Sequence, residues 1–125
     1  MIFHSPPSLA LPKEYLEFLD KHNINYQIVE RLEDVAPTLD VVYATRIQKE
    51  RFILPVEYER VKNAYSLDRD FARKLKPTCR IMHPLPRINE LNKNLDSAEQ
   101  AVYFEQAHNG VFVRQALLAL VLGAL

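Results

Sequence analysis

Residues 39–51, LDVVYATRIQKER, decide the fold that this sequence predicts. Residues 41–44 (VVYA) are short, β-branched and apolar, which is typical of a buried strand. Polarity then changes abruptly, because five of the next seven residues carry charged or amide side chains. In an open parallel sheet, ligands bind just beyond the carboxyl ends of the strands. The segment therefore predicts a strand that delivers a polar loop to a binding site.

Arg46 and Gln48 are the candidate ligand-binding side chains of this loop. An arginine and a glutamine two residues apart offer several N–H donors, and a guanidinium can hold a carboxylate through two parallel hydrogen bonds. A solvated charged loop has the same composition. The pattern by itself therefore leaves a binding loop and an ordinary surface loop both open.

A second strand and loop follow at residues 80–87, RIMHPLPR. Two prolines around one residue force an extended, irregular backbone and remove two N–H donors. The carbonyl groups of this loop are then free to face a ligand amine. If the two strands are parallel, both loops open on the same edge of the sheet.

The rest of the chain alternates strands with helical segments, which predicts an α/β fold with a parallel sheet and flanking helices. The helix expected at residues 12–22 places Tyr15, Phe18, Leu19 and His22 on one face, which should pack on the sheet. The expected strands are residues 1–4, 25–29, 41–44 and 78–82, and the expected helices are residues 12–22, 55–64, 98–107 and 111–122.

Smaller features complete the predicted element order. Pro37 limits residues 32–39 to one or two helical turns. Ser66 or Asp68 caps a short helix that follows the one at 55–64. Residues 92–97 are expected to form a polar loop, and Asn109-Gly110 is expected to break the C-terminal helical region. The inner residues of the helix at 55–64 are expected to be Val56, Val61 and Ala64.

Composition excludes several classes of function. With 16 basic and 16 acidic residues in 125, the formal charge is zero, which gives no support for a nucleic-acid or membrane-surface partner. The single cysteine, Cys79, fits a reducing compartment and a small buried side chain. The four histidines show no metal-ligand spacing, and no secretory signal or spanning segment is expected.

Three blocks of the sequence, in order and in register, resemble the aspartate carbamoyltransferase catalytic chain. They are TRIQKER at residues 45–51, HPLPRINE at residues 83–90, and a C-terminal block with YFEQA at 103–107 and NGVFVRQALLALVL at 109–122. The related ornithine carbamoyltransferases carry a Cys in the His-x-Leu-Pro motif and lack the Arg-x-Gln-Lys-Glu-Arg loop. The aspartate enzyme is therefore the closer match.

The resemblance implies roles for individual residues. Arg46 and Gln48 would donate to a carboxylate of L-aspartate, and the backbone carbonyls of Pro84 and Leu85 would orient its amine. It also implies a cis peptide bond between Leu85 and Pro86, a structural His83, and a Glu50 that holds Arg46 in place. No catalytic side chain, metal or cofactor is implied. The supporting residues are Thr45, Lys49, Glu50, Arg51, Pro86 and Arg87.

The resemblance also implies an incomplete architecture. Residues 1–97 would form part of a doubly wound, Rossmann-like aspartate-binding domain, and residues 98–125 would form helices that pack onto a carbamoyl phosphate domain. The family's phosphate loop and carbamoyl-binding motif do not occur in these 125 residues, and neither does the first strand of the aspartate domain. That strand lies mid-sheet in the family, so a gap is expected between residues 1–4 and 41–44. A truncated or split coding unit is expected.

The activity implied is transfer of a carbamoyl group from carbamoyl phosphate to the amine of aspartate, giving N-carbamoyl-L-aspartate in pyrimidine biosynthesis. The family works in the cytoplasm as a homotrimer. Alone, this chain is expected to be inactive, because carbamoyl phosphate would reach it only through the other domain. The alternative is a non-catalytic remnant that acts as an interaction or assembly module through its apolar C-terminal helix.

Overall fold

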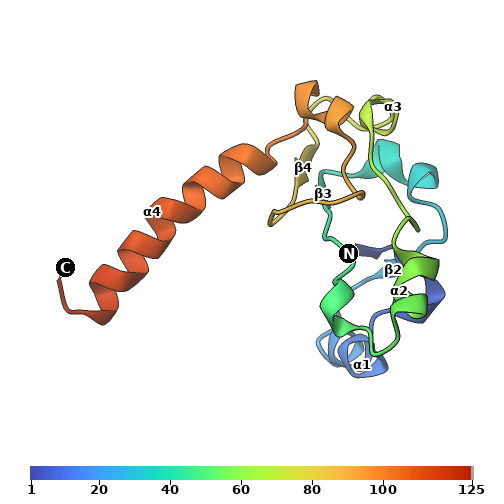
Figure 1. Cartoon of the computed structure of the whole chain (residues 1–125), viewed down its shortest axis with the longest axis horizontal. Helices are drawn as coiled ribbons and strands as arrows, with labels where there is room; N and C mark the ends of the chain where they lie inside the picture. Colours follow the sequence, from blue (N-terminus) through green and yellow to red (C-terminus); the bar gives the residue numbers. More distant parts are fainter. Residues whose placement is uncertain (125) are drawn as a thin grey trace.

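A computed structural model describes residues 1–124 as an α/β structure with a long C-terminal helix that projects from it (Figure 1). Short 3₁₀ turns join the main elements, and two of them, Leu32–Asp34 and Ala36–Thr38, form the turns predicted around Pro37. In order, the strands and α-helices are β1 (Ile2–Phe3), α1 (Lys13–Lys21), β2 (Gln27–Ile28), β3 (Val41–Tyr43), α2 (Pro55–Val61), α3 (Arg69–Ala72), β4 (Arg80–Met82) and α4 (Tyr103–Val121).

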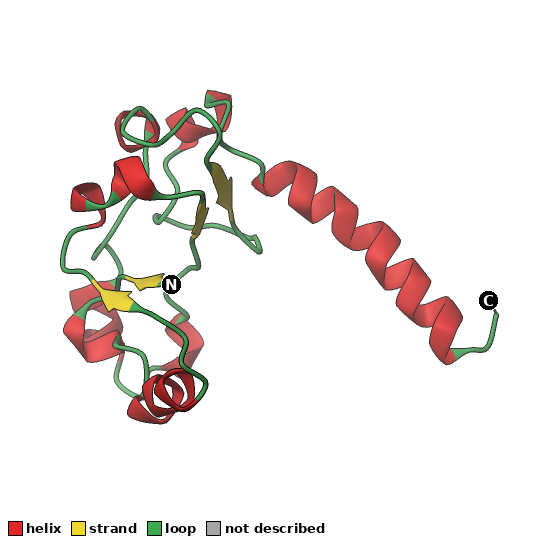
Figure 2. Ribbon diagram, turned by 180° about the vertical axis from the view of Figure 1, so that it is seen from behind, coloured by secondary structure: helices red, strands yellow, loops and turns green. Residues whose placement is uncertain are grey.

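The four strands form two separate parallel pairs. In one pair β1 lies beside β2, with Phe3 opposite Ile28. In the other pair β3 lies beside β4, with Val42 opposite Ile81. The gap expected between the first and third strands is therefore confirmed. Figure 2 shows the two pairs of strands lying apart in the body of the molecule.

The core lies around β3 and β4. Ile81, Cys79 and Leu95 are fully buried, together with Tyr103 at the start of α4. Cys79 is the small buried side chain that the sequence predicted. Alternation along β3 buries Val42 but leaves Val41 and Tyr43 about half exposed, so the strand that the sequence predicted to be buried is buried on one face only.

The N-terminal helices pack less apolar surface than predicted. On α1 only Leu19 is buried, whereas Tyr15 and Phe18 are more than half exposed and Phe18 stacks on His22. The two-stranded β1–β2 pair offers little surface for the predicted face to cover. On α2 the buried residue is Tyr58; the predicted inner residues Val56 and Ala64 are exposed and Val61 is only partly buried.

Capping explains where α3 begins. The Asp68 side chain accepts the backbone N–H of Phe71 at 2.8 Å, which satisfies one of the free donors of the first turn. Of the two candidates, Ser66 and Asp68, it is therefore Asp68 that caps the helix. Leu75, just beyond this short helix, is also buried.

Residues 92–97 form an ordered turn rather than a polar loop. Asn92 caps a 3₁₀ helix, Lys93–Ser97, by accepting the backbone N–H of Asn94. Leu95 in its middle is fully buried against the core. One buried leucine anchors this otherwise polar segment.

The predicted break at Asn109-Gly110 is wrong, because α4 is continuous from Tyr103 to Val121. It also begins five residues later than the expected residue 98. A glycine inside a helix costs only about 1 kcal/mol relative to alanine, which the favourable residues around it offset. In Figure 1, α4 leaves the body of the molecule, and its apolar side chains beyond Tyr103 are largely exposed.

Candidate functional site

The parallel pairing of β3 and β4 brings the two predicted loops to one edge of the sheet. Tyr43 lies opposite Met82, so residues 45–51 and residues 83–87 both begin at that edge. The backbone N–H of Ala44 donates to the carbonyl of Met82 at 2.9 Å and extends the pairing to the start of the first loop. The sequence predicted this meeting of loops only on condition that the strands are parallel.

Arg46 is held by Glu50. Both guanidinium Nη atoms donate to the carboxylate, one of them at 3.1 Å from Nη1 to Oε2. The hydrogen bond to Glu50 raises the pKa of Arg46, and the bond from Arg46 lowers the pKa of Glu50. The ion pair predicted between these residues is confirmed. It fixes a guanidinium that stays partly exposed and charged at neutral pH.

A cavity of about 410 Å³ lies beside this ion pair. Arg46, Gln48 and Arg51 line one side, and the segment that follows β1, including Ser5 and Pro6, lines the other. Two arginines and a glutamine thus line a shared space, and side chains of these types can bind a small anion. Within residues 1–124 the Gln48 amide makes no side-chain hydrogen bond, so its donors are available.

Aromatic packing orders the loop between β3 and α2. Phe52 lies edge-on to Tyr58 with ring centroids 5.7 Å apart, and the Lys49 ammonium lies 5.8 Å from the Tyr58 ring centroid. A cation over an aromatic face is worth roughly 0.5–1 kcal/mol at an exposed site. Lys49 therefore supports the loop from outside the cavity.

The second loop is organised by His83, which is buried. Its Nδ1 accepts the backbone N–H of Leu85 at 2.9 Å, and its Nε2 lies 2.9 Å from Oε1 of Glu90, although the two are poorly aligned for a hydrogen bond. Glu90 also accepts the backbone N–H groups of Ile88 and Asn89. The acceptor role of Nδ1 places the proton of a neutral ring on Nε2, toward Glu90.

Burial lowers the pKa of His83 below its ordinary value, although the Glu90 carboxylate acts in the opposite direction. The ring is therefore neutral near pH 7. His83 holds the loop in place rather than supplying a charge, which is the structural function expected of it.

Leu85 has the unusual backbone of this loop. Its φ of +49° lies in the left-handed region that non-glycine residues rarely adopt, at a cost of order 1–3 kcal/mol. The hydrogen bond to His83 supports this conformation. The peptide bond between Leu85 and Pro86 is cis, as the resemblance predicted.

Arg87 is paired rather than free. Its guanidinium donates to both oxygens of Asp96, at 2.7 Å from Nη2 to Oδ2, and lies over the rings of Tyr103 and Phe104. Tyr103 donates its hydroxyl to Asp96. Arg87 therefore ties the second loop to the start of α4.

Two further residues that connect the site were not singled out from the sequence. Tyr65 donates its hydroxyl to the carbonyl of Thr45, directly before Arg46. The Gln106 side chain accepts the backbone N–H of His83 at 2.9 Å and reaches the hydroxyl of Tyr43 at 3.4 Å. Both bonds join distant parts of the chain, so no local pattern could have revealed them.

The structure brings some predicted residues together and leaves others apart. Arg46, Gln48, Arg51 and Thr45 all line the 410 Å³ cavity, whereas Pro84 and Leu85 do not contribute to its wall. Across residues 1–124, no three side chains are grouped to hold a metal ion, and no helix is long and apolar enough to cross a membrane.

Comparison with known proteins identifies the family of this chain. The Asp/Orn binding domain of aspartate/ornithine carbamoyltransferases matches residues 2–121. The chain belongs to this family. A catalytic subunit of aspartate carbamoyltransferase from Clostridium novyi is 47% identical over 122 residues, which cover 98% of this chain and 40% of the relative. That of Methanosarcina mazei is 45% identical over 125 residues, covering all of this chain and 40% of the relative.

Solved structures of carbamoyltransferases have the same fold. The catalytic subunit of M. jannaschii aspartate transcarbamoylase superimposes with a TM-score of 0.82 at 45% identity, over 94% of this chain and 39% of that subunit. The Trypanosoma cruzi enzyme in complex with carbamoyl phosphate and aspartate gives 0.82 at 31% identity, with the same coverage. The chain thus spans about two fifths of the length of the carbamoyltransferases it matches.

Proposed function

We propose that this chain is the aspartate-binding portion of an aspartate carbamoyltransferase. The observation that carries the proposal is the Arg46–Glu50 ion pair at the carboxyl end of β3, beside a cavity that Gln48 also lines. A guanidinium fixed by one carboxylate keeps other N–H donors for a second carboxylate, that of the substrate. The family match and the relatives named for this activity support the same substrate.

In the proposed reaction, the aspartate amine attacks the carbonyl carbon of carbamoyl phosphate. The new C–N bond forms as the C–O bond to phosphate breaks, and the phosphate leaves with the electron pair and takes up the proton that the amine loses. Arg46 and Gln48 would hold a carboxylate of aspartate, and the carbonyls of Pro84 and Leu85 would accept N–H bonds from its amine. The contribution of these groups is positioning, which can supply a large part of a rate enhancement.

We also propose a domain organisation and a cellular setting for this enzyme. Residues 1–97 would form the aspartate-binding unit, and residues 98–125 would pack on a carbamoyl phosphate domain. The enzyme would work as a homotrimer in the cytoplasm and serve pyrimidine biosynthesis. The apolar side chains that α4 leaves exposed support a packing partner for this helix.

Complementation tests the proposal. The 125-residue chain is mixed with a polypeptide that spans the part of the Clostridium novyi relative outside its match, and N-carbamoyl-L-aspartate is measured. We expect no product from either polypeptide alone and clear product from the mixture. Product from this chain alone would contradict the proposal, because the carbamoyl phosphate site would then lie within these 125 residues.

The second candidate is an interaction module without catalytic function. The exposed apolar residues of α4 favour it, since such a surface marks a contact with another protein. Stable co-purification of the two polypeptides without any product would favour this candidate over the enzyme.

A further inference from the structure

The edge of β4 that faces away from β3 pairs with the residues just before α4. The backbone N–H of Ile81 donates to the carbonyl of Gln100 at 2.7 Å, and the N–H of Val102 donates to the carbonyl of Ile81 at 3.0 Å. These bonds form a short parallel bridge between Ile81 and Ala101. In Figure 1, α4 begins beside β4, directly after this bridge. β4 therefore has a hydrogen-bonded neighbour on both edges.

His83 carries the next backbone donor on this edge, because alternate residues of a strand direct their N–H groups to the same side. Continued parallel pairing would give this N–H the carbonyl of Val102. That carbonyl is already used, since Val102 caps α4 and accepts the backbone N–H of Gln106 at 2.9 Å. The side-chain Oε1 of Gln106 accepts the N–H of His83 instead, also at 2.9 Å. Gln106 thus takes the carbonyl with its backbone and supplies a substitute acceptor with its side chain.

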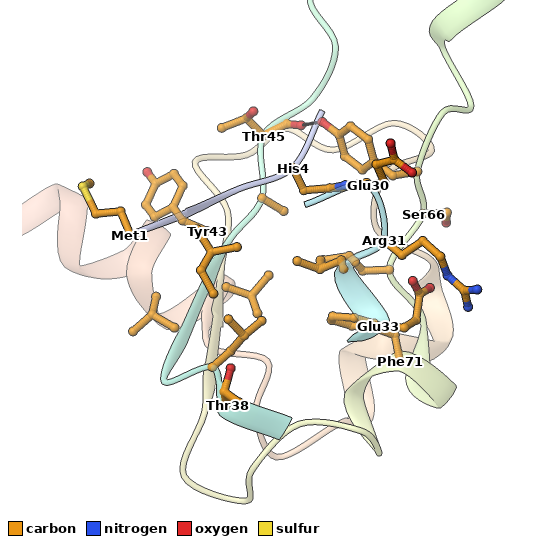
Figure 3. Close-up of a pocket in the computed structure, with 18 of the residues that line it drawn as sticks. Met1, His4, Glu30, Arg31, Glu33, Thr38, Tyr43, Thr45, Ser66 and Phe71 are labelled. Carbon is orange, nitrogen blue, oxygen red and sulfur yellow. Dashed lines mark hydrogen bonds between the residues drawn. The ribbon is translucent and has the colours of Figure 1, made fainter. Parts of the chain in front are cut away.

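The other end of the Gln106 amide reaches β3. Its Nε2 lies 3.4 Å from the hydroxyl of Tyr43, the last residue of that strand. This distance is long for a hydrogen bond, so it is the weaker of the two contacts. Figure 3 shows Tyr43 and Thr45 on the segment that leads into the loop of Arg46. One amide therefore contacts the chain just before each of the two loops.

Gln106 is the link between the loops at this edge of the sheet. Within residues 1–124, pairing between β3 and β4 ends where the N–H of Ala44 donates to Met82, and no hydrogen bond joins the two loops directly beyond that point. The Arg46–Glu50 ion pair lies inside the first loop. In this part of the chain, Gln106 is the one side chain that hydrogen-bonds beside the start of both loops. It therefore fixes how the loops lie relative to each other.

We propose that Gln106 is a positioning residue, which sets the spacing between the two loops and so between the two ends of a bound aspartate. This inference rests on the proposed function, in which Arg46 holds a carboxylate and the carbonyls of Pro84 and Leu85 hold the amine. Gln106 does not line the 410 Å³ cavity, so it acts through the backbone that it holds. A displacement of about 1 Å at a reacting group can cost on the order of 100-fold in rate.

The chemistry of glutamine suits this position. The two contacts need an acceptor for the N–H of His83 and a polar partner for the hydroxyl of Tyr43, and one amide group supplies both. Methionine has a similar length but offers only a weakly accepting sulfur. Glutamate keeps an oxygen acceptor for His83. Gln106→Met therefore removes the link, and Gln106→Glu retains its stronger half.

Amide hydrogen exchange of the 125-residue chain tests the link itself. We expect Gln106→Met to speed exchange of the His83 amide about fivefold or more, the effect of losing one hydrogen bond, while Val42 inside the β3–β4 pair changes little. Gln106→Glu should restore slow exchange. Gln27→Met, at an exposed position of β2, is the matched control and should match the unaltered chain. An unchanged His83 rate in Gln106→Met would overturn the inference.

The complemented enzyme tests what the link does. Succinate is aspartate without its amine, so the first loop alone would hold it, whereas aspartate needs both loops. We expect Gln106→Met to lower the catalytic efficiency for aspartate about tenfold or more and to leave the inhibition constant of succinate within about twofold. Gln27→Met should change neither value. Equal weakening of both ligands would indicate a general loss of structure and would overturn the positioning role.

Arg46→Ala separates failure of this inference from failure of the proposed function. If Arg46→Ala weakens both ligands and Gln106→Met weakens neither, the inference is wrong and the proposed function stands. If Arg46→Ala changes neither ligand, or if the mixture makes no product, the proposed function fails and the inference fails with it. Fast exchange of the His83 amide in Gln106→Met would then show a structural link without a substrate to position.

Discussion

The β3–β4 region and α4 are both rich in apolar residues, yet they differ in what covers them. Ile81 in β4 is fully buried among core side chains. Leu118 in α4 is of similar size and is 62% exposed. Burying such a side chain is worth roughly 1.5–3 kcal/mol, so the first region holds itself together and the second offers surface for another polypeptide.

Polar contacts repeat this contrast. Side-chain pairs hold the loops after β3 and β4 in place: Arg46 pairs with Glu50 in the first loop, and His83 and Arg87 of the second loop pair with Glu90 and Asp96. Beyond its first turn, α4 has no ion pair within residues 1–124. The comparison teaches that contacts within this chain hold the two loops in place, whereas α4 beyond its first turn leaves its apolar side chains exposed.

The largest expected effect concerns association. We expect the isolated chain to self-associate through α4, because burying its several exposed apolar side chains against a second copy lowers the free energy. Leu118→Lys/Val121→Lys should reduce the association strongly. Light scattering measures the mass, and a sharp monomer of the unaltered chain with a protected α4 would break the contrast drawn between the two regions.

The next largest effect is on the free energy of unfolding, when one large aliphatic residue in each region is replaced by alanine. Ile81→Ala should lower the free energy of unfolding by about 2–5 kcal/mol, because it leaves a cavity in the core. At dilutions where the chain is dissociated to monomer, Leu118→Ala should change it by less than about 0.5 kcal/mol, because in the monomer its side chain is largely in solvent. Urea titration of both variants measures the difference. Equal losses would show that α4 is packed in solution.

A smaller effect is expected where the two regions meet. Tyr103→Phe removes the hydroxyl that donates to Asp96, while Arg87 still pairs with that carboxylate. We expect a loss of about 1 kcal/mol in the free energy of unfolding, the usual contribution of one hydrogen bond. Tyr15→Phe, at an exposed position of α1, is the matched control and should change nothing. Identical values for the two variants would show that the bond to Asp96 does not stabilise the chain.

The smallest expected effect depends on pH. Burial lowers the pKa of His83 in the folded chain below the ordinary histidine value of 6.5. Below pH 6.5 the unfolded chain therefore binds a proton at His83 more readily than the folded chain does. Stability should therefore be unaffected by His83 above that pH and should fall as the pH drops from about 6.5 to 5. His83→Asn keeps an acceptor for Leu85 and should remove this dependence. Thermal unfolding of both chains across this range measures it, and parallel pH profiles would exclude His83 as the source.

Local patterns predicted the parts of the fold that local chemistry determines. The apolar run at β3 and the capping Asp68 are both found as expected. The resemblance further supplied the gap beside β1 and the cis bond at Leu85. Each of these depends on a few adjacent residues or on a pattern already associated with the family.

The remaining features depend on contacts between distant residues. Apolar spacing placed Val56 inside α2, but Tyr58 is buried because Phe52 and Lys49 pack on its ring. Gly110 looked like a helix break, yet its cost is small within nineteen helical residues. The bond from Gln106 to His83 joins positions 23 residues apart, so no periodicity reveals it.

Aspartate saturation of the complemented enzyme tests the central claim most directly. The claim is that Arg46 binds a carboxylate of aspartate, and a hydrogen bond to a charged group contributes about 1.5–3 kcal/mol. Arg46→Ala should therefore lower the catalytic efficiency for aspartate at least tenfold and leave the dependence on carbamoyl phosphate nearly unchanged. Arg73→Ala, which breaks a surface pair with Asp70, is the matched control and should match the unaltered chain. An unchanged aspartate profile for Arg46→Ala would contradict the account.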